Sequence, residues 1–161
     1  MHTIPFFRPD ITEAEIAEAA DTLRSGWITT GKKTKLFEKR LQETVFPFSG
    51  KAGSLICLNS ATAAEELNLR VWGIRPGDEV IVPAFTYTAT ASAAIHCGAT
   101  IRLIDIQKDG DPVTHAPEMD YSALHETITE KTKAVIPVDY GGILVSVNSE
   151  TYRPSRSDLI F

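Results

Sequence analysis

The stretch that decides the fold runs from Ser54 to Ile95 and reads SLICLNSATAAEELNLRVWGIRPGDEVIVPAFTYTATASAAI. It starts with an apolar run that predicts a buried strand over Leu55–Leu58, and it continues through a short polar turn into a predicted helix. A second strand is predicted over Val80–Pro83, after the turn-forming sequence Pro76-Gly77-Asp78. A strand, a helix and a second strand in this order are typical of a parallel βαβ unit.

The same alternation continues along the chain. Two further strands are predicted over Ile101–Asp105 and Ala134–Val138, and helices are predicted between the strands, one of them capped by Asp120. The strands are short, nearly continuous apolar runs, which fits strands that are buried on both faces. We therefore predict an α/β fold with three layers, in which helices cover both faces of a mainly parallel sheet of four strands.

Ahead of this core the sequence predicts an extended arm over Pro5–Pro9 and two helices. The first helix, in ITEAEIAEAADTLRSG, has a capping box formed by Thr12 and Glu15 and ends at Gly26. On this first helix Ile16, Ala20 and Leu23 share one face. Two sets of apolar residues are expected to face inward: Phe37 and Leu41 on the second helix, and Ala64, Leu67 and Val71 on the helix after Ser60.

The turn before the helix at Ala61 has the composition of a phosphate site. The first turn of a helix leaves backbone N–H groups without acceptors, and these groups attract an anion together with the helix dipole. The hydroxyls of Ser60 and Thr62 lie beside those groups, and the small side chains of Ala61 and Ala63 allow a ligand to approach the backbone. The alternative is an ordinary N-cap at Ser60, which needs no ligand.

Three motifs in sequence order carry a family resemblance. They are the turn Ser60-Ala61-Thr62-Ala63-Ala64, the strand segment GDEVIVP that starts at Gly77, and the aromatic turn FTYTATA that starts at Phe85. In order and wording they resemble the DegT/DnrJ/EryC1/StrS family of sugar aminotransferases, which use pyridoxal 5'-phosphate (PLP). The resemblance extends from about Pro5 to Gly142, and it implies part of the large domain of the fold type I aminotransferases.

The resemblance also implies roles for individual residues. Ser60, Ala61, Thr62 and Ala63 match the family's phosphate cradle, and Tyr87 matches the aromatic residue that stacks on the pyridine ring of the cofactor. The segment Trp27–Gly31 resembles a GW-[IL]-T-x-G motif, which implies that Thr29, Thr30 and Gly31 border the sugar pocket. For Trp27 itself we favour a hydrophobic plug between two helices, and for the other three residues a plain loop is the alternative.

Several polar and aromatic residues follow predicted strands, and ligands collect at the carboxyl ends of parallel strands. Asn59-Ser60, Phe85-Thr86-Tyr87, Asp105 and Asp139-Tyr140 all fall at such ends, so we expect the pocket there. A catalytic pair of Asp105 and Asp139 is disfavoured, because aspartates at strand ends commonly cap turns. None of the lysines is expected at this edge in a dry environment, and no catalytic residue is assigned.

The predicted organisation is a truncated aminotransferase large domain over residues 1–142 and a divergent, poorly ordered tail over residues 143–161. Within the first part, residues 1–50 form the arm and N-terminal helices and residues 51–142 form the α/β core. In the family, the Schiff-base lysine and the aspartate that binds the pyridine nitrogen lie further along the sequence. The chain is therefore expected to be inactive alone and to bind PLP weakly or not at all.

Composition narrows the class of protein. The 161 residues carry a net charge of −5, which argues against a nucleic-acid partner. Neither of the two cysteines, Cys57 and Cys97, nor any histidine shows the spacing of a metal site, and the cysteines are expected to be reduced. No signal peptide or membrane span is predicted, so a cytoplasmic location is expected.

Three functional hypotheses follow. The first is the N-terminal part of a PLP-dependent aminotransferase that transfers an amino group from a donor such as glutamate to a nucleotide-linked keto-sugar, for a polysaccharide or a glycosylated metabolite. By resemblance to the family, this protein would be a homodimer. The second is a binding module that keeps the phosphate cradle without the chemistry. The third is an interaction fragment that pairs with an intact homologue.

Overall fold

The computed structural model describes residues 4–5, 8–45, 54–109 and 116–144. The chain divides into two compact units, an N-terminal unit over Met1–Cys57 and a C-terminal unit over Leu58–Phe161. Most of the tail predicted to be poorly ordered lies outside the described residues. In the parts of the chain that are described, no helix combines the length and the apolar character that a membrane crossing requires.

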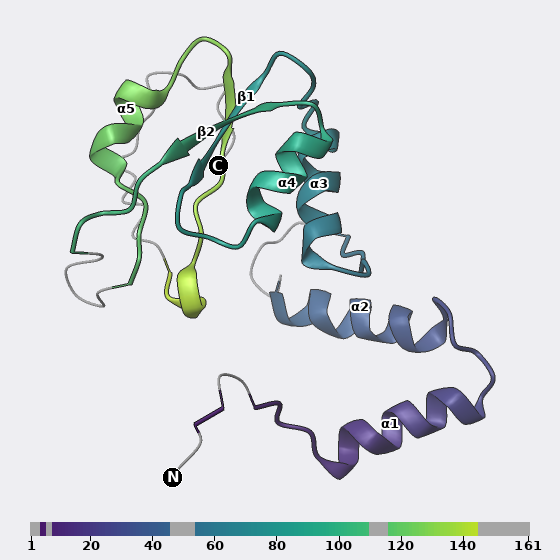
Figure 1. Ribbon diagram of the computed structural model, residues 1–161. Helices are drawn as coiled ribbons and strands as arrows, with labels where there is room; N and C mark the ends of the chain where they lie inside the picture. The colour runs from purple at the N-terminus through teal and green to yellow at the C-terminus, as the bar shows by residue number, and fades with distance from the viewer. Residues whose placement is uncertain (1–3, 6–7, 46–53, 110–115, 145–161) are drawn as a thin grey trace. The chain divides into compact units, whose positions relative to one another are not determined.

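The C-terminal unit contains a parallel sheet of three described strands, β1 (Glu79–Pro83), β2 (Thr100–Ile104) and β3 (Thr132–Val135). The strand order is β2-β1-β3, with Val80 of β1 in register with Ile101 on one side and Ala134 on the other. Figure 1 shows β1 crossing the middle of this unit. The predicted parallel pairing is confirmed for these three strands.

The fourth predicted strand, Leu55–Leu58, is wrong. This segment is irregular, and the side chains of Ile56 and Leu58 are 73% and 42% exposed. An apolar run forms a strand only where a neighbouring strand offers backbone groups for hydrogen bonds. Here the Cys57 N–H donates instead to the carboxylate of Glu38, at 2.9 Å.

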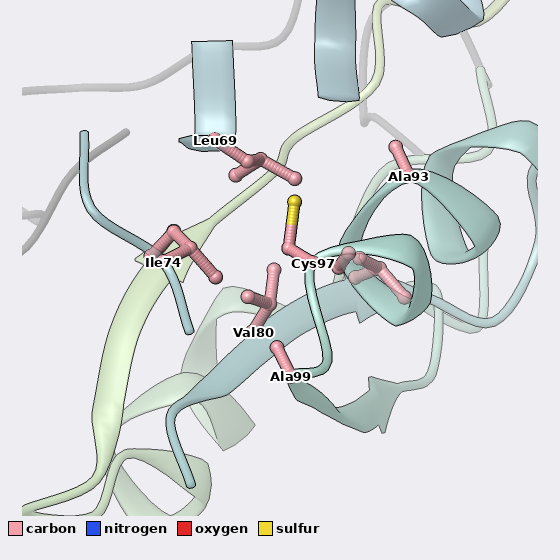
Figure 2. Packing of buried hydrophobic residues seen from close by; sticks show 9 residues of the cluster. Leu69, Ile74, Val80, Ala93, Cys97 and Ala99 are labelled. Carbon is pink, nitrogen blue, oxygen red and sulfur yellow. The ribbon is translucent and has the colours of Figure 1, made fainter. Parts of the chain in front are cut away.

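Successive residues of β1 point to opposite faces of the sheet, as the two-residue period of a strand requires. Val80 and Val82, both fully buried, belong to one apolar cluster. That cluster is completed by residues from the helices and turns on this face: Leu69, Ile74, Ala93, Ala94, Cys97 and Ala99, together with Ala134 of β3. Figure 2 shows Leu69, Cys97 and Val80 converging from three elements.

The opposite face of the sheet has its own cluster. Ile81, also fully buried, packs with Ile104, Met119, Leu124 and Val135. Helices therefore lie on both faces of the sheet, α3 and α4 on one and α5 on the other (Figure 1). The predicted three-layer α/β architecture is confirmed.

The helical elements of this unit are shorter than some predictions. They are α3 (Ala61–Val71), α4 (Ala89–His96), the 3-10 turn η1 (Tyr121–Ala123), α5 (Leu124–Thr127) and a second 3-10 turn, η2 (Tyr140–Gly142). Asp120 caps η1 as predicted, since its side chain accepts from the Ser122 N–H at 3.0 Å. The single helix predicted after it is instead one 3-10 turn followed by one α-helical turn.

The predicted inward face of α3 is wrong. Leu67 and Val71 are 45% and 74% exposed, whereas Leu69 is 2% exposed and packs in the core. Apolar residues lie on more than one side of this helix, so their spacing alone did not identify the buried side. Which side of α3 is buried depends on the position of the sheet.

The N-terminal unit contains α1 (Glu13–Arg24) and α2 (Lys32–Val45). The predicted capping box of α1 is confirmed, because Thr12 and Glu15 exchange both hydrogen bonds. The inward face predicted for the second helix is only partly found, because Phe37 is 57% exposed and Leu41 is half-buried, and neither α1 nor α2 has a fully buried residue. An amphipathic pattern shows which face is apolar, but burial also requires a surface to cover it.

The two-sided burial of β1 gives a stability prediction. We expect Ile81→Ala to lower the free energy of unfolding by about 2–5 kcal/mol, because it opens a cavity in a fully packed layer. The matched control is Ile95→Ala on α4, where the side chain is 57% exposed and the loss should stay below about 1 kcal/mol. Urea denaturation measures both values, and equal losses would contradict the described core.

Candidate functional site

The first turn of α3 is the centre of the candidate site. Ser60 is the N-cap in an extended conformation, and its hydroxyl oxygen accepts a hydrogen bond from the Ala63 N–H at 3.1 Å. The Ser60 carbonyl accepts from the Ala64 N–H at 3.2 Å. The ordinary N-cap that the sequence offered as an alternative to a phosphate site is therefore present.

The cap does not use all the donors of this turn. Among the described residues, the N–H groups of Ala61 and Thr62 have no protein acceptor. The Ser60 hydroxyl accepts a hydrogen bond and keeps its own proton for donation, and Thr62 carries a second hydroxyl. Several donors at the positive end of an eleven-residue helix suit a phosphate dianion, so the cap and an anion site are compatible here.

Residues that follow β1 and β3 come together at the carboxyl edge of the sheet. Phe85, after β1, and Tyr140, after β3, form a tilted aromatic pair with ring centroids 5.2 Å apart and an interplanar angle of 42°. Tyr87 lies on the turn that leads into α4 and is 80% exposed, so its ring is available to a flat ligand. The sequence identified these residues as neighbours of the edge but gave no sign of the ring pair.

The two aspartates at this edge have different surroundings. The Asp105 carboxylate accepts from the Ile106 N–H at 2.8 Å, and the Asp105 carbonyl accepts from the Asp120 N–H at 2.8 Å, beside the antiparallel bridge between Ile106 and Met119. Asp139 is exposed and precedes η2 without capping it through its side chain. Neither aspartate is described as a side-chain cap of a turn, and the expectation that they form no catalytic pair stays a prediction.

The side chain of Tyr121, on η1, is half-buried. Burial, together with the charge of the neighbouring Glu118, raises the pKa of Tyr121 well above its ordinary range. Its hydroxyl therefore keeps its proton at neutral pH and does not serve as a general base.

The position of α3 against α4 is fixed by a polar brace that the sequence reading missed. The Glu66 carboxylate accepts from the Arg70 guanidinium at 2.9 and 2.7 Å, and its other oxygen lies 2.9 Å from His96 Nδ1 on α4. Arg70 also donates to the His96 carbonyl at 2.8 Å. The Glu-x-x-x-Arg spacing of Glu66 and Arg70 was a readable signal for the part of this brace that lies within α3.

The residues predicted to border a sugar pocket lie in the N-terminal unit, on the loop between α1 and α2. Thr29, Thr30 and Gly31 line an open hollow of about 720 Å³. Its other lining residues are Thr22, Ser25, Trp27, Ile28, Lys32, Lys33, Thr34 and Lys35. Of these, Lys33 is held by Glu18 and Asp21 at 2.6 and 2.7 Å.

Trp27 shapes this loop, although not as a buried plug. Its side chain is 64% exposed, so the plug interpretation is wrong for the described chain. The indole N–H donates to the Thr30 carbonyl at 3.0 Å, and the ring folds over Gly31, where a Cβ would overlap it. Trp27 therefore fixes the loop by a hydrogen bond and by contact with a glycine.

The other groups considered for chemistry are a metal site, the lysines near the sheet and the thiol of Cys97. Within the described residues, no group of three or more His, Cys, Asp or Glu side chains is arranged to hold a metal ion. The described lysines nearest to the sheet are Lys131 and Lys133, at the start of β3 and thus at the amino edge. Burial raises the pKa of the Cys97 thiol, which packs in the core and is a poor nucleophile at neutral pH.

The comparison with known protein families is decisive. The sequence matches the DegT/DnrJ/EryC1/StrS aminotransferase family over residues 9–151. The chain belongs to this family.

Two curated relatives show how similar the chain is to known proteins and how much of their length it covers. The chain is 38% identical over 146 residues to UDP-4-amino-4-deoxy-L-arabinose–oxoglutarate aminotransferase of Shewanella sediminis, covering 91% of this chain and 35% of the relative. It is 39% identical over 141 residues to the spore coat polysaccharide biosynthesis protein SpsC of Bacillus subtilis, covering 88% and 33%. The chain therefore spans about a third of the length of these relatives.

Solved structures agree with the family assignment. A protein of Streptococcus pneumoniae described as a sugar aminotransferase, Spr1654, has 56% identity and a TM-score of 0.77 in its PMP form, covering 90% of this chain and 34% of that one. The same protein has been solved in a PLP form, with a TM-score of 0.76. A 3-amino-5-hydroxybenzoic acid synthase matches with 28% identity, a TM-score of 0.71 and coverage of 88% and 35%.

PLP, the cofactor expected from this family, can be tested against the residues present. Its phosphate fits the donor set at Ser60, Ala61 and Thr62, because the N–H groups of the latter two have no protein acceptor among the described residues and no bulky side chain lies in this turn. Its ring is flat and aromatic, and the exposed Tyr87 offers a surface of the same kind. The residues present therefore fit the group's phosphate and ring.

The cap at Ser60 gives a prediction. Ser60→Ala removes the acceptor of the Ala63 N–H and should lower the free energy of unfolding by about 1 kcal/mol. Thr88 is the matched control, since it is the N-cap of α4 and its side chain makes no cap hydrogen bond. Thr88→Ala should cost less than about 0.5 kcal/mol in the same urea titrations. A larger loss at Thr88 than at Ser60 would contradict the described caps.

The brace at Glu66 predicts a dependence on pH. The hydrogen bonds from Arg70 and then from His96 lower the pKa of this carboxyl below its ordinary value of 4.5. A lowered pKa means that the stabilisation is fully present above about pH 4.5 and is lost as the pH falls through the folded-state value. The difference in unfolding free energy between wild type and Glu66→Gln should therefore be constant near neutral pH and should narrow in acid.

Urea titrations between about pH 3.5 and pH 7 measure this difference. The Arg70→Gln background is the control, because Glu66→Gln should have a smaller effect where the main partner is already absent. A difference that widens in acid would show that the brace has been misread.

Proposed function

We propose that this chain is the N-terminal part of a PLP-dependent aminotransferase that transfers an amino group to a nucleotide-linked keto-sugar. The observation that carries the proposal is the first turn of α3, in a chain of the DegT/DnrJ/EryC1/StrS family: it has two hydroxyls and two N–H groups for which the described residues offer no acceptor. PLP supplies an electron sink for amino transfer when it is bound. Family membership supports an aminotransferase, whereas a nucleotide-linked sugar is supported by the name of the Shewanella sediminis relative.

In this proposal the described residues form parts of two sites, one for PLP and one for the sugar. Ser60, Ala61, Thr62 and Ala63 hold the phosphate of PLP, and Tyr87 stacks on its ring. Thr29, Thr30 and Gly31 line the sugar side, and the hollow around them supports this assignment by its place and size. The amino group would come from a donor such as glutamate, and the product would serve polysaccharide or glycosylated-metabolite synthesis.

We further propose that the chain alone does not catalyse the transfer. Amino transfer with PLP requires a lysine beside the cofactor ring. Among the described lysines, Lys131 and Lys133 lie at the start of β3, and Lys108 is exposed in the turn after β2. None of these three is described in a dry pocket at the carboxyl edge.

A binding experiment tests the cofactor site. PLP should bind weakly and be removed by dialysis, and Thr62→Ala should weaken the binding about tenfold or more, because a hydrogen bond to a charged group contributes roughly 1.5–3 kcal/mol. The control is Thr44→Ala on α2, where the hydroxyl donates to the Arg40 carbonyl at 3.0 Å. Absorbance titrations with PLP measure each dissociation constant, and equal constants for both variants would refute the phosphate assignment.

Borohydride reduction of the chain mixed with PLP, followed by peptide mapping, tests the expected lack of catalysis. We expect scattered and incomplete labelling of surface lysines. One lysine labelled stoichiometrically, and protected by added glutamate, would contradict the proposal that the chain alone is inactive.

A homodimer is the proposed assembly, and the exposed apolar side chains of the N-terminal unit support it. Ile28, Leu36 and Phe37 are 71%, 47% and 57% exposed, on α2 and the loop before it, where a second copy of the chain would bury them. Sedimentation velocity should show concentration-dependent dimers. Phe37→Ser should weaken the dimer by about tenfold or more, since burying a phenylalanine contributes about 1.5–3 kcal/mol, while Arg40→Ser on the same helix should not. A monomer at all concentrations would contradict this assembly.

A further inference from the structure

The ring pair of Phe85 and Tyr140 joins two turns that are far apart in the sequence. Phe85 follows β1, Tyr140 follows β3, and these two strands are neighbours in the sheet. Both rings remain partly open, with exposed fractions of 49% and 43%. A contact of this kind at the carboxyl edge connects the loops on which a ligand site would depend.

The turn after β1 carries Tyr87 and is stabilised by hydrogen bonds with the start of α4. The Thr90 N–H donates to the Tyr87 carbonyl at 3.2 Å, and the hydroxyls of Thr86 and Thr90 lie 3.2 Å apart. These bonds fix the turn to the start of α4, while Ala84 is tied to β2 by its N–H bond to the Ile104 carbonyl at 2.7 Å. None of these bonds connects the turn to β3, and the Phe85 ring provides that connection.

The turn that carries Tyr140 is itself well defined. The Tyr140 N–H donates to the Val138 carbonyl at 2.9 Å, and the Gly142 N–H donates to the Asp139 carbonyl at 3.0 Å. Gly141 and Gly142 have φ values of +67° and +80°, in the left-handed region that glycine tolerates best. Tyr140 is therefore presented from a turn with a fixed backbone, which suits a side chain that positions another element.

We propose that Tyr140 is a positioning residue, which holds the turn over residues 84–88 through its contact with Phe85 and thereby sets the place of the Tyr87 ring. The first half of this inference concerns the fold of the chain alone. The second half rests on the proposed function, since it assumes that PLP stacks on Tyr87. Tyr140 acts through Phe85 and is not assigned a contact with the cofactor.

The amide of Thr90 reports on the first half, because it is hydrogen-bonded to the Tyr87 carbonyl. In NMR hydrogen-exchange experiments on the 161-residue chain, Tyr140→Ala should accelerate exchange at Thr90 about two- to tenfold, the range that an aromatic pair implies. Tyr140→Phe keeps a ring and should exchange like wild type. The amide of Glu79, bonded to the Lys131 carbonyl at the other edge of the sheet, is the reference.

Two exchange results would overturn the inference. One is an unchanged rate at Thr90 in Tyr140→Ala. The other is an equal acceleration at Thr90 and Glu79, which would mean that Tyr140 only contributes to general stability. A Phe85→Leu variant gives a second measurement in case Tyr140→Ala does not fold, and it should accelerate exchange at Thr90 while leaving Glu79 unchanged.

PLP titration tests the second half. Tyr140→Ala should weaken binding about two- to tenfold, Tyr140→Phe should restore it, and in a Tyr87→Ala background Tyr140→Ala should have no further effect. If Tyr140→Ala binds PLP as wild type does, the positioning of Tyr87 is refuted while the proposed function stands. If wild type binds no PLP, the proposed function fails, and the exchange rates alone decide the positioning role.

Discussion

The structure depends on one constraint, the burial of β1 on both faces. Val80 and Val82 point to the layer of α3 and α4, and Ile81 points to the layer of α5. All three side chains are fully buried, so each layer is held to the sheet through this strand. Since both neighbouring strands also pair with β1, the carboxyl edge, where the ring pair lies, depends on the same strand.

This constraint explains why the candidate site is assembled from short polar segments. Parallel strands end at a common edge, so the turns after β1 and β3 meet there, and Phe85 touches Tyr140 across about 55 residues of sequence. The α3 helix is fixed on its layer by Leu69 in the core and by the brace from Glu66 to Arg70 and His96. Its first turn then presents two N–H groups that no described residue accepts from, a state that favours an anionic ligand.

The features of the structure that depend on neighbouring residues in the sequence could be predicted. The capping box at Thr12 and Glu15, the caps at Ser60 and Asp120 and the parallel direction of three strands all follow from short patterns, whereas the strand order does not. The resemblance in the motifs around Ser60 and Phe85 likewise identified the family that the comparison established. The roles of individual site residues stay predictions.

The errors occur where burial depends on a distant partner. Leu55–Leu58 has the composition of a strand, but no described strand pairs with it, and Ile56 is exposed. Phe37 and Val71 lie on apolar helix faces that nothing described covers, while Leu69 is buried because the sheet lies beneath it. The aromatic pair could not be foreseen for the same reason, since contact between Phe85 and Tyr140 depends on strand order and not on spacing.

A ¹H–¹⁵N NMR titration of the chain with PLP shows whether the first turn of α3 binds the phosphate of the cofactor. The amide resonances of Ala61 and Thr62 should shift first and by the largest amounts, and inorganic phosphate should shift the same two resonances. Shifts confined to residues outside this turn, with Ala61 and Thr62 unmoved at saturation, would contradict this binding.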